Sequence, residues 1–262
     1  MPNAVQTIAG FVTAAGAQTT IITPSPGDIV TIPSFALTSK AYLEKLAASG
    51  ATVDFVRVRS PRLHDANQGL RVWVGSTLRR ELLPSGLQET LYPSDTPTIE
   101  IDATGAGTNG VIFSYGFDDL PGVQPLMDTW ENIKPRIIHT MGCEVDVTSG
   151  AIGAWGASAA LNSAFDNFEA GANYAWLGYT LSVACLGISM TGKDTGNVRI
   201  GGPGNTDPIE TRSYFVDWDV RNPQPRIPII QANNRSSTIL QNVDVAAATA
   251  TKVTLYLAQL SS

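Results

Sequence analysis

The closing stretch of the sequence, Lys252-Val-Thr-Leu-Tyr-Leu-Ala-Gln-Leu260, decides the fold class. In it Val253, Leu255 and Leu257 alternate with residues that are smaller or carry a polar group. A period of two residues is typical of a strand with one buried face. A strand this apolar must be paired within a sheet, because an unpaired hydrophobic edge promotes aggregation.

A second stretch, Ser213-Tyr-Phe-Val-Asp-Trp-Asp-Val220, has the same period. It places Tyr214, Val216, Trp218 and Val220 on one side, and a phenylalanine and two aspartates on the other. We therefore predict a half-buried strand over residues 213–220.

The composition favours many short strands joined by irregular loops. Of 262 residues only 15% are charged, against a usual quarter, whereas 24 are Gly and 16 are Pro. Strand-like runs recur roughly every 10 to 15 residues, a spacing typical of sandwiches, jelly rolls and barrels rather than βαβ units. Besides 213–220 and 252–260, strands are predicted at 19–23, 28–32, 52–59, 70–74, 98–101, 111–115, 136–140, 144–147, 176–190, 197–200, 229–230 and 238–240.

Helices are predicted only as insertions between strands. Residues 37–49 would place Tyr42, Leu43 and Leu46 on one helical face, and residues 157–170 repeat apolar residues at spacings of four and three. Shorter helical turns are predicted at 78–83 and 126–133.

The domain organisation follows from these two series. Each half of the chain shows strands, a helical insertion and more strands, so we predict two antiparallel β-sandwiches, over residues 19–132 and 133–262. Residues 1–18 are small and weakly apolar, and are predicted to form an N-terminal arm that orders against a neighbouring molecule.

Charge and cysteine content exclude several classes. The net charge of −6, with no Lys or Arg before Lys40, argues against a nucleic-acid surface. Cys143 and Cys185 lie in apolar strand-like sequence and are predicted to be buried free thiols. Residues 174–190 fall short of a membrane span, and the N-terminus lacks signal-peptide features, so synthesis in the cytoplasm without standard export is expected.

Two glycine-rich runs resemble phosphate-binding motifs. Residues 105–110 match G-x-G-x-x-G, but residues 111–115 are β-branched and aromatic, so a hairpin loop is predicted instead of a helix. Residues 187–194 are close to a P-loop, but Asp194 replaces the magnesium-binding hydroxyl. A strand-to-turn connection is predicted there.

The two histidines do not form a recognisable catalytic or metal motif. His64 with Asp65 lies in a polar loop, and His139 lies on a predicted strand near Cys143. A nucleophile–base pair or half a metal site is conceivable for His139 and Cys143, but no third or fourth ligand has a suitable spacing. We therefore predict no catalytic residues, no metal and no cofactor; a hydrolase would need one histidine beside a nucleophile.

The acidic residues offer a weak calcium hypothesis. Asp118, Asp119, Asp146, Asp217 and Asp219 supply oxygen ligands but lack a dense Asp and Gly loop. Exposed strand faces are the simpler interpretation.

Aromatic residues provide the alternative function. Trp73 and Trp218 alternate with aliphatic residues and are predicted to be core, whereas Trp155 lies between glycines and is the more exposed candidate. Together with Tyr92, Trp155 suggests a carbohydrate-binding or host-recognition β-sandwich, either a spike or a lectin-like module.

The succession of a neutral arm over 1–18, two strand series interrupted at 37–49 and 157–170, and closing strands through Leu260 resembles a known family. It is similar to the jelly-roll major capsid proteins of tailless icosahedral bacterial viruses, especially those with two jelly rolls per subunit. The resemblance implies an all-β virion protein, not an enzyme, made in the host cytoplasm, which assembles as homotrimers into an icosahedral shell. Its expected partners are copies of itself, other capsid proteins and an internal membrane, without direct nucleic-acid binding.

Assembly would use the loop-rich sides of the subunit. We predict contacts between subunits along residues 60–69, 84–97 and 201–210, with the arm completing a neighbour. Deletion of residues 1–18 is accordingly predicted to leave a folded chain that assembles poorly.

Overall fold

The computed structural model describes residues 4–28, 41–60, 69–74, 89–91, 97–117, 125–161, 168–221 and 225–261. Their strands form four antiparallel sheets, two from the first half of the chain and two from the second. Helical segments are short and lie in the second half: α1 (Trp130–Ile133), α2 (Pro208–Thr211), α3 (Tyr214–Arg221), and the 3-10 turns η1 (Lys134–Arg136), η2 (Lys193–Thr195) and η3 (Ala232–Ser237).

The first half of the chain forms a complete jelly roll. Its sheets have the strand orders β3-β1-β9-β4-β7 and β2-β8-β5-β6. When the eight main strands are lettered B to I in chain order, omitting the two-residue β3, these orders read B-I-D-G and C-H-E-F, the pairing of a jelly roll. We call this unit the first roll; its strands are β1 (Ala4–Ala14), β2 (Gln18–Ile21), β3 (Thr23–Pro24), β4 (Ala41–Ser49), β5 (Val53–Arg59), β6 (Leu70–Trp73), β7 (Glu89–Leu91), β8 (Thr98–Ala103) and β9 (Gly107–Phe117).

The second half repeats the same order. Its sheets are β10-β16-β13-β18-β11 and β12-β17-β14-β15, which again read B-I-D-G and C-H-E-F when the two-residue β10 is omitted. The predicted antiparallel sandwich with two jelly rolls is confirmed. This second roll comprises β10 (Met127–Asp128), β11 (Ile137–Thr148), β12 (Ala159–Ala160), β13 (Asn173–Leu181), β14 (Gly187–Thr191), β15 (Ile200–Pro203), β16 (Ile227–Gln231), β17 (Ile239–Val243) and β18 (Ala250–Leu260).

The closing strand β18 is as its sequence predicts. It pairs with β11 on one side and with β13 on the other. Val253, Leu255 and Leu257 are fully buried and contribute to the core of the second roll, whereas Thr254 and Tyr256 on the opposite face are partly exposed. Alternation therefore sets which face of this strand lies inside the sandwich.

The predicted strand over 213–220 is wrong, because Tyr214–Arg221 is the helix α3. Tyr214, Phe215 and Trp218 are all buried, at spacings of one and four residues that share a helical face. Phe215 packs against Trp176 of β13, with the ring centroids 4.4 Å apart. The apolar residues fit both the two-residue period of a strand and the 3.6-residue period of a helix. Packing against β13 favours the helix.

The helix predicted over 37–49 is also wrong in its described part, because Ala41–Ser49 forms β4 between β9 and β7. Every residue from Leu43 to Ser49 is buried. A strand covered on both faces loses the alternation that would identify it.

The other predicted helices have mixed outcomes. In the segment 157–170, Ala159–Ala160 is the strand β12, paired with β17, so the helix is wrong there; residues 162–167 lie outside the described ones. The helical turn predicted within 126–133 is confirmed as α1. The stretch 78–83 lies outside the described residues.

The segment predicted as an arm contains the strand β1, which lies between β9 and the two-residue β3 near the edge of its sheet. From Ala4 to Ala14, β1 pairs residue for residue with β9. Its side chains are buried on both faces, with Ile8 and Val12 in the core of the first roll and Val5 against that of the second. The residues of β1 that face the second roll include the small Thr7 and Ala9.

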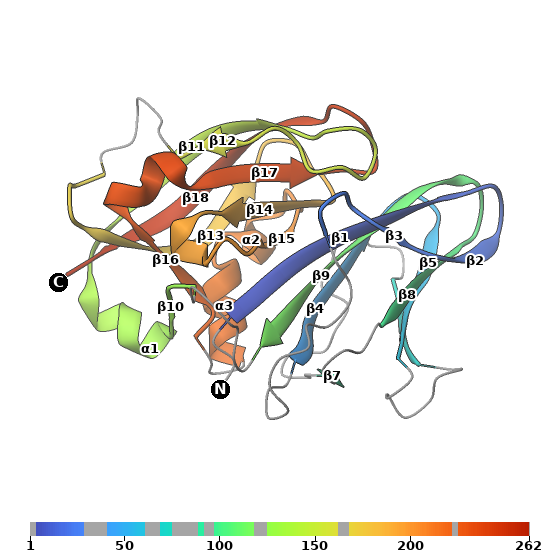
Figure 1. Ribbon diagram of the computed structural model, residues 1–262, viewed down its shortest axis with the longest axis horizontal. Helices are drawn as coiled ribbons and strands as arrows, with labels where there is room; N and C mark the ends of the chain where they lie inside the picture. The colour runs from blue at the N-terminus through green and yellow to red at the C-terminus, as the bar shows by residue number, and fades with distance from the viewer. Residues whose placement is uncertain are drawn as a thin grey trace.

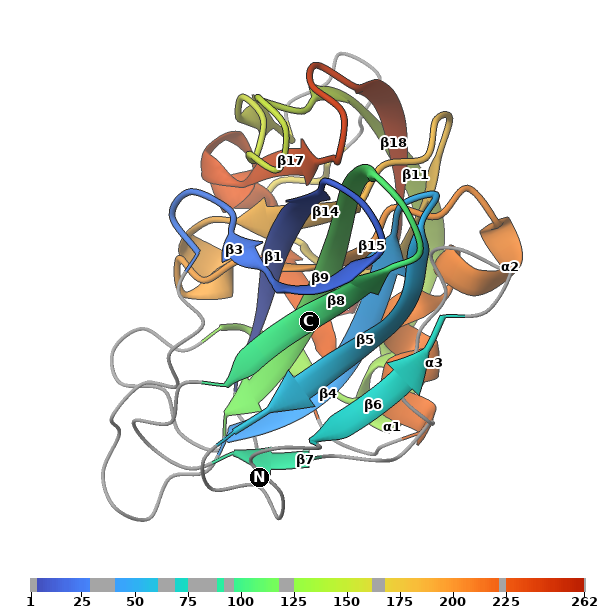
Figure 2. The same cartoon turned by 90° about the vertical axis from the view of Figure 1, so that its right-hand side faces the viewer.

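The two rolls lie side by side with one sheet of each in contact. Figure 1 shows β1, β9 and β4 of the first roll next to β14, β15 and α3 of the second. Figure 2, turned by 90°, looks onto the first roll and shows β8, β5 and β6 in front, on the side away from the second roll. The B-I-D-G sheet of the first roll therefore faces the C-H-E-F sheet of the second.

Candidate functional site

The contact between the rolls, which we call the inter-roll interface, is the most highly organised surface of the described chain. On the first roll it uses the outer faces of β1, β4 and β9, and on the second β14, β15, α3 and the loops beside them. Its apolar centre contains Ala9, Ala47 and Ile112 of the first roll packed on Leu186 and Val243 of the second. Small side chains on one sheet allow the other sheet to approach closely.

Glycines in this interface stand where a side chain would collide with the other roll. A Cβ on Gly110 would lie 2.7 Å from Leu186, and a Cβ on Gly187 would overlap Ile112. Gly153 likewise faces the ring of Phe11. Real Cβ atoms do not approach other atoms so closely, so glycine at these positions leaves room for the Leu186, Ile112 and Phe11 side chains of the other roll.

Enlarging Gly187 is expected to weaken the molecule. In Gly187→Val the branched side chain would push Ile112 away, which we expect to lower the free energy of unfolding by about 1–3 kcal/mol, the usual cost of overpacking. Urea unfolding measures the change. The matched control is Gly16→Val, where no atom lies within 4 Å, and a change of at most about 0.5 kcal/mol is expected. Equal stability of the two variants would contradict the tight fit.

A buried ion pair crosses the inter-roll interface. Arg226 lies just before β16. Its guanidinium donates from Nε to Glu44 Oε2 of β4 at 2.7 Å and from Nη2 to Glu44 Oε1. Both side chains are inaccessible to solvent. Burial raises the pKa of Glu44, opposed by Arg226 and by a hydrogen bond from Trp218. A Cβ on Gly116 would overlap the Glu44 carboxylate, so glycine makes room for this pair.

A second polar cluster joins the rolls around Asp28. Its carboxylate accepts hydrogen bonds from Ala9 N at 2.9 Å, from Trp155 Nε1 at 2.8 Å and from Arg199 Nε at 3.2 Å. The Arg199 guanidinium also lies 4.3 Å from the centre of the Trp155 ring. Trp155 and Arg199 belong to the second roll, so this carboxylate binds both rolls together. The expectation of an exposed Trp155 is wrong.

The Asp28 cluster has a consequence for pH dependence. Burial raises the pKa of Asp28, and the hydrogen bonds and the charge of Arg199 only partly oppose this. A carboxyl group with a raised folded-state pKa binds its proton more tightly when folded, so its contribution to stability is greatest in acid and declines as pH rises through that pKa. We expect the stability of the wild type relative to Asp28→Asn to fall as the pH rises above about 4, the ordinary pKa of an aspartate, toward neutral pH. Urea unfolding across this range measures it, and a relative stability that rises with pH would contradict a raised pKa.

The backbones of the two rolls also bond directly. Thr7 N of β1 donates to Arg199 O at 2.6 Å, and Thr7 Oγ1 accepts from Gly201 N at 2.9 Å and lies 3.1 Å from Gly201 O. Thr7 Oγ1 also lies 3.0 Å from Ser114 Oγ of β9. With the ion pair and the Asp28 cluster, these bonds connect the two rolls at several points along the interface.

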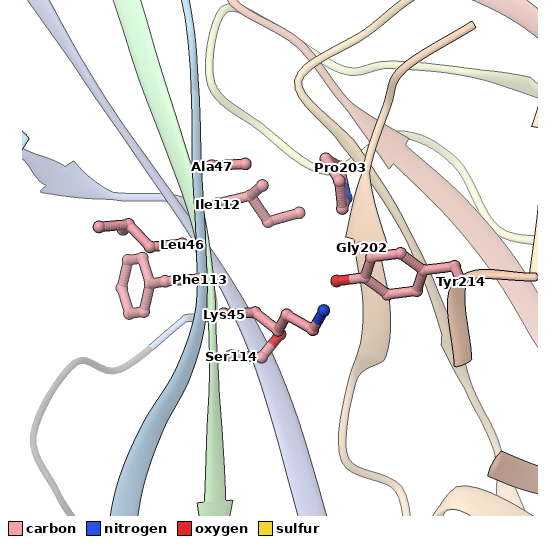
Figure 3. A pocket seen from close by; sticks show the side chains of 9 residues that line it. All are labelled: Lys45, Leu46, Ala47, Ile112, Phe113, Ser114, Gly202, Pro203 and Tyr214. Atoms are coloured by element: carbon pink, nitrogen blue, oxygen red, sulfur yellow. The ribbon is translucent and has the colours of Figure 1, made fainter. Parts of the chain in front are cut away.

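A small hollow at this interface is lined almost entirely by apolar atoms. Figure 3 shows Lys45 and Ser114 of the first roll and Tyr214 of the second around it. The Lys45 ammonium lies 5.0 Å from the centre of the Tyr214 ring and 5.2 Å from that of Trp218, a cation–π arrangement. Lys45 thus contacts two aromatic side chains of α3 across the interface.

The histidine and cysteine candidates are not brought together. His139 is exposed and Cys143 is buried. They are four residues apart on β11 and so share one face of the strand, but about 13 Å of strand separates them, too far for a nucleophile and its base to bond. His64 and Asp65 lie outside the described residues. The prediction of buried free thiols is confirmed for Cys143 and Cys185. In the part of the chain that the structure describes, no three His, Cys, Asp or Glu side chains gather as metal ligands.

The glycine-rich runs connect strands. Residues 104–106 link β8 to β9, which belong to different sheets, so the predicted hairpin is a crossover between the two layers. Residues 187–194 run from β14 into η2, as predicted. The Asp194 carboxylate there accepts from Gln231 N at 2.9 Å and Asn234 Nδ2 at 2.7 Å, which fixes neighbouring loops.

The acidic calcium candidates are dispersed. Asp219 is buried and accepts from Trp130 N at 2.8 Å, so the expected exposed strand face is wrong for it. Asp217 accepts from Ser213 within α3 and its preceding turn, and Asp146 is exposed on β11. Asp118 and Asp119 lie outside the described residues.

Two tryptophans and one loop differ in their outcomes. Trp218 is core, as predicted, whereas Trp73 is 60% exposed, so that prediction is wrong. Tyr92 and most of 60–69 and 84–97 lie outside the described residues. In 201–210, Gly201 and Gly202 are buried at the inter-roll interface, so they are not available to another subunit.

Among the helices that the structure describes, none is long and apolar enough to cross a membrane.

Comparison with known proteins adds distant structural similarities only. No protein-family description matches the sequence, and no curated protein matches it. The chain is similar to a crystal structure of the STIV major capsid protein, with 7% identity and a TM-score of 0.21 over 98% of this chain and 96% of that one. It is also similar to a chain in the atomic structure of Sulfolobus Turreted Icosahedral Virus, with 9% identity and a TM-score of 0.23 over 98% and 91%. TM-scores this low do not establish a shared fold, so the jelly-roll assignment rests on strand order alone.

Proposed function

We propose that this chain is the major capsid subunit of an icosahedral virus and acts by self-assembly into a shell. The observation that carries the proposal is the pair of jelly rolls with identical strand order, locked by buried polar groups into one block. A shell subunit is a static building block, and this one presents the same architecture twice. The sequence resemblance points to a tailless bacterial virus as its source.

The proposed building unit is a homotrimer. Three copies of a two-roll block around a threefold axis bring six similar rolls into a ring, which gives a hexagonal tile for a closed shell. The division of the chain, predicted at residues 132 and 133, is proposed to lie earlier, between β9 and β10, because β10 pairs with β16 of the second roll. The proposal includes the virion as location and other capsid proteins and an internal membrane as partners, without direct nucleic-acid contact.

The mass of the purified protein tests this function. Mass photometry over a concentration series, combined with negative-stain images, is expected to show trimers, flat sheets or shells. A monodisperse monomer at every concentration would overturn the proposal.

The alternative, a carbohydrate-binding module, receives less support from the structure. Its main candidate, Trp155, has its indole N–H bonded to Asp28 and its ring covered by Arg199. A sugar platform requires an uncovered aromatic face. Binding of a glycan array by a monomer would restore this alternative.

A further inference from the structure

The second roll has a long strand at the edge of one of its sheets. Strand β11 is the last strand of its sheet, and among the described strands it pairs with β18 alone (Figure 1). It has 12 residues and contains neither Pro nor Lys, two residue types that commonly protect edge strands. Its register shift lies at its start, between Ile137 and His139, so the rest of the strand follows β18 regularly. A regular edge of this kind is a template for a further strand.

The pairing with β18 determines which backbone groups of β11 point outward. Ser182 N, just after β13, donates to Lys252 O at 3.0 Å, and Lys252 N donates to Ser182 Oγ at 2.9 Å. Lys252 therefore directs its N–H and C=O toward β13 and away from β11. Asp146, which lies opposite Lys252, accordingly directs its own N–H and C=O away from β18. The alternate residues of β11 with the same orientation are Thr140, Gly142 and Glu144.

The outward backbone groups of these four residues are available for pairing. All four residues are exposed, and no described residue forms a hydrogen bond with their N–H or C=O groups. From Thr140 to Asp146 the edge is about 20 Å long. A strand placed along it would replace bonds to water with a ladder of hydrogen bonds.

The corresponding edge in the first roll is already covered. There β1 occupies the position that β11 has in the second roll, and its Phe11 pairs with the two-residue strand β3. Further along, Ala9 N donates to Asp28 Oδ2 at 2.9 Å, and Thr7 N donates to Arg199 O at 2.6 Å. The same strand position thus has antiparallel and polar partners in one roll, whereas in the other the described chain supplies none from Thr140 to Asp146.

We propose that β11 pairs antiparallel with β11 of a second copy, about a twofold axis at Gly142, so that one sheet continues across both molecules. In this register Gly142 lies opposite Gly142, and Thr140 of each copy lies opposite Glu144 of the other. These three residue pairs form about six hydrogen bonds between the copies. The contact is isologous, because both copies use the same surface. The inference rests on the proposed function and names a contact that joins neighbouring building units of the shell.

The charges of β11 select this register. The Glu144 and Asp146 side chains are 53% and 78% accessible and lie on the exposed face of the sheet. With Gly142 on the axis, no carboxylate of one copy lies directly or diagonally opposite a carboxylate of the other. An axis at Cys143 would bring the two Glu144 side chains to diagonal positions, and an axis at Glu144 would place them directly opposite, which is destabilising. A shift in the other direction would use the irregular start of the strand.

Site-specific cross-linking of the full-length chain tests the pairing. In Gly142→Cys the two new thiols would face each other, with Cα atoms about 5.5 Å apart, within the range of a disulfide. A Cβ at this position lies 3.3 Å from the Thr254 methyl group, so a small shift accommodates it. The native Cys143 and Cys185 are buried. After mild oxidation, non-reducing electrophoresis is expected to show at least about tenfold more linked dimer than in the control Asp146→Cys, whose thiols would lie about 26 Å apart.

A charge at position 140 provides an independent test. Thr140→Glu would place a carboxylate opposite Glu144 at two symmetric positions, and is expected to weaken association by about two- to thirtyfold. Thr140→Lys is expected to strengthen association, because opposite charges then face each other. Thr13→Glu and Thr13→Lys make the same changes at an exposed position in the first roll and are expected to have no effect. Sedimentation equilibrium measures the association constants, and thermal melting verifies that each variant is folded.

The outcomes distinguish this contact from the proposed function. Equal cross-linking of Gly142→Cys and Asp146→Cys, or a folded Thr140→Glu variant that associates like the wild type, would overturn the pairing. The shell function would stand in that case if the wild type still formed trimers and shells. Cross-linking through position 142 in a chain that never grows beyond a dimer would support the pairing and overturn the shell function. A wild-type chain that is monomeric at every concentration would overturn both.

Discussion

Removal of residues 1–14 is expected to abolish folding of the first roll. The deletion takes away β1, which pairs along its whole length with β9, and it uncovers the apolar residues of both cores. Ile8 and Val12 leave the first core, and Val5 leaves the second. Burial of each such side chain contributes about 1.5–3 kcal/mol, so the combined loss is comparable with the total stability of a typical domain, and the lost hydrogen bonds between β1 and β9 add to it.

Circular dichroism and thermal melting of the truncated chain measure this loss. The expected result is aggregation or a chain that lacks a cooperative transition for the first roll, with β9 left without a neighbour on one side. A chain truncated only by residues 1–3, before β1 begins, serves as the control. A soluble 15–262 chain with an unchanged melting temperature that fails only in assembly would restore the interpretation of these residues as an arm.

Breaking the buried ion pair is the second change with a large expected effect. In Glu44→Ala the Arg226 guanidinium stays fully buried without its carboxylate partner. Loss of one partner of a buried pair costs about 3–5 kcal/mol, because the remaining charge is uncompensated. Urea unfolding at pH 7 measures the free energy of unfolding.

The matched controls separate charge from packing. Replacing both partners, as Glu44→Leu with Arg226→Met, removes both charges and is expected to leave stability near that of the wild type or above it. Glu144→Ala breaks the solvent-exposed pair with Lys252 and is expected to change stability little. If Glu44→Ala were no more harmful than Glu144→Ala, the pair would not be buried as described.

The strands that alternate clearly are the part of the fold that sequence predicts. In β18 and β5 one face is buried and the other meets solvent, so period two is visible in Val253, Leu255 and Leu257 and in Val56 and Val58. The pairing of β5 with β6 also follows from neighbouring strand-like runs. Fold class is therefore accessible from the sequence.

Where both faces of a strand are covered, the same reasoning fails. Strand β4 is buried throughout Leu43 to Ser49, and β1 is covered on both faces along most of its length. The residue types along these two strands depend on the neighbouring roll, and the local sequence carries no information about that roll. The prediction for α3 fails for a related reason. Tyr214 and Trp218 fit the period of a strand as well as that of a helix, and only the packing against β13 distinguishes the two.

The inter-roll interface was not predicted, and little in the sequence marks it. Asp28 and Arg199 are far apart in the chain, as are Glu44 and Arg226. A buried ion pair is ordinarily unremarkable in sequence, because only the fold shows that both charges lose water. The glycines at 110 and 187 were the available signal, and they were interpreted as loop and turn residues.

The pairing of β1 with β9 has a consequence for synthesis on the ribosome. Ala4 of β1 pairs with Phe117 of β9, so β1 has no partner strand until β9 has been synthesised. At translation rates of about 5–20 residues per second, the nascent chain carries an unmatched apolar strand for roughly 6 to 20 seconds. The same delay recurs for β11, because Thr148 at its end pairs with Ala250 of β18. Newly made chains at high local concentration would thus depend on chaperones at two separate moments.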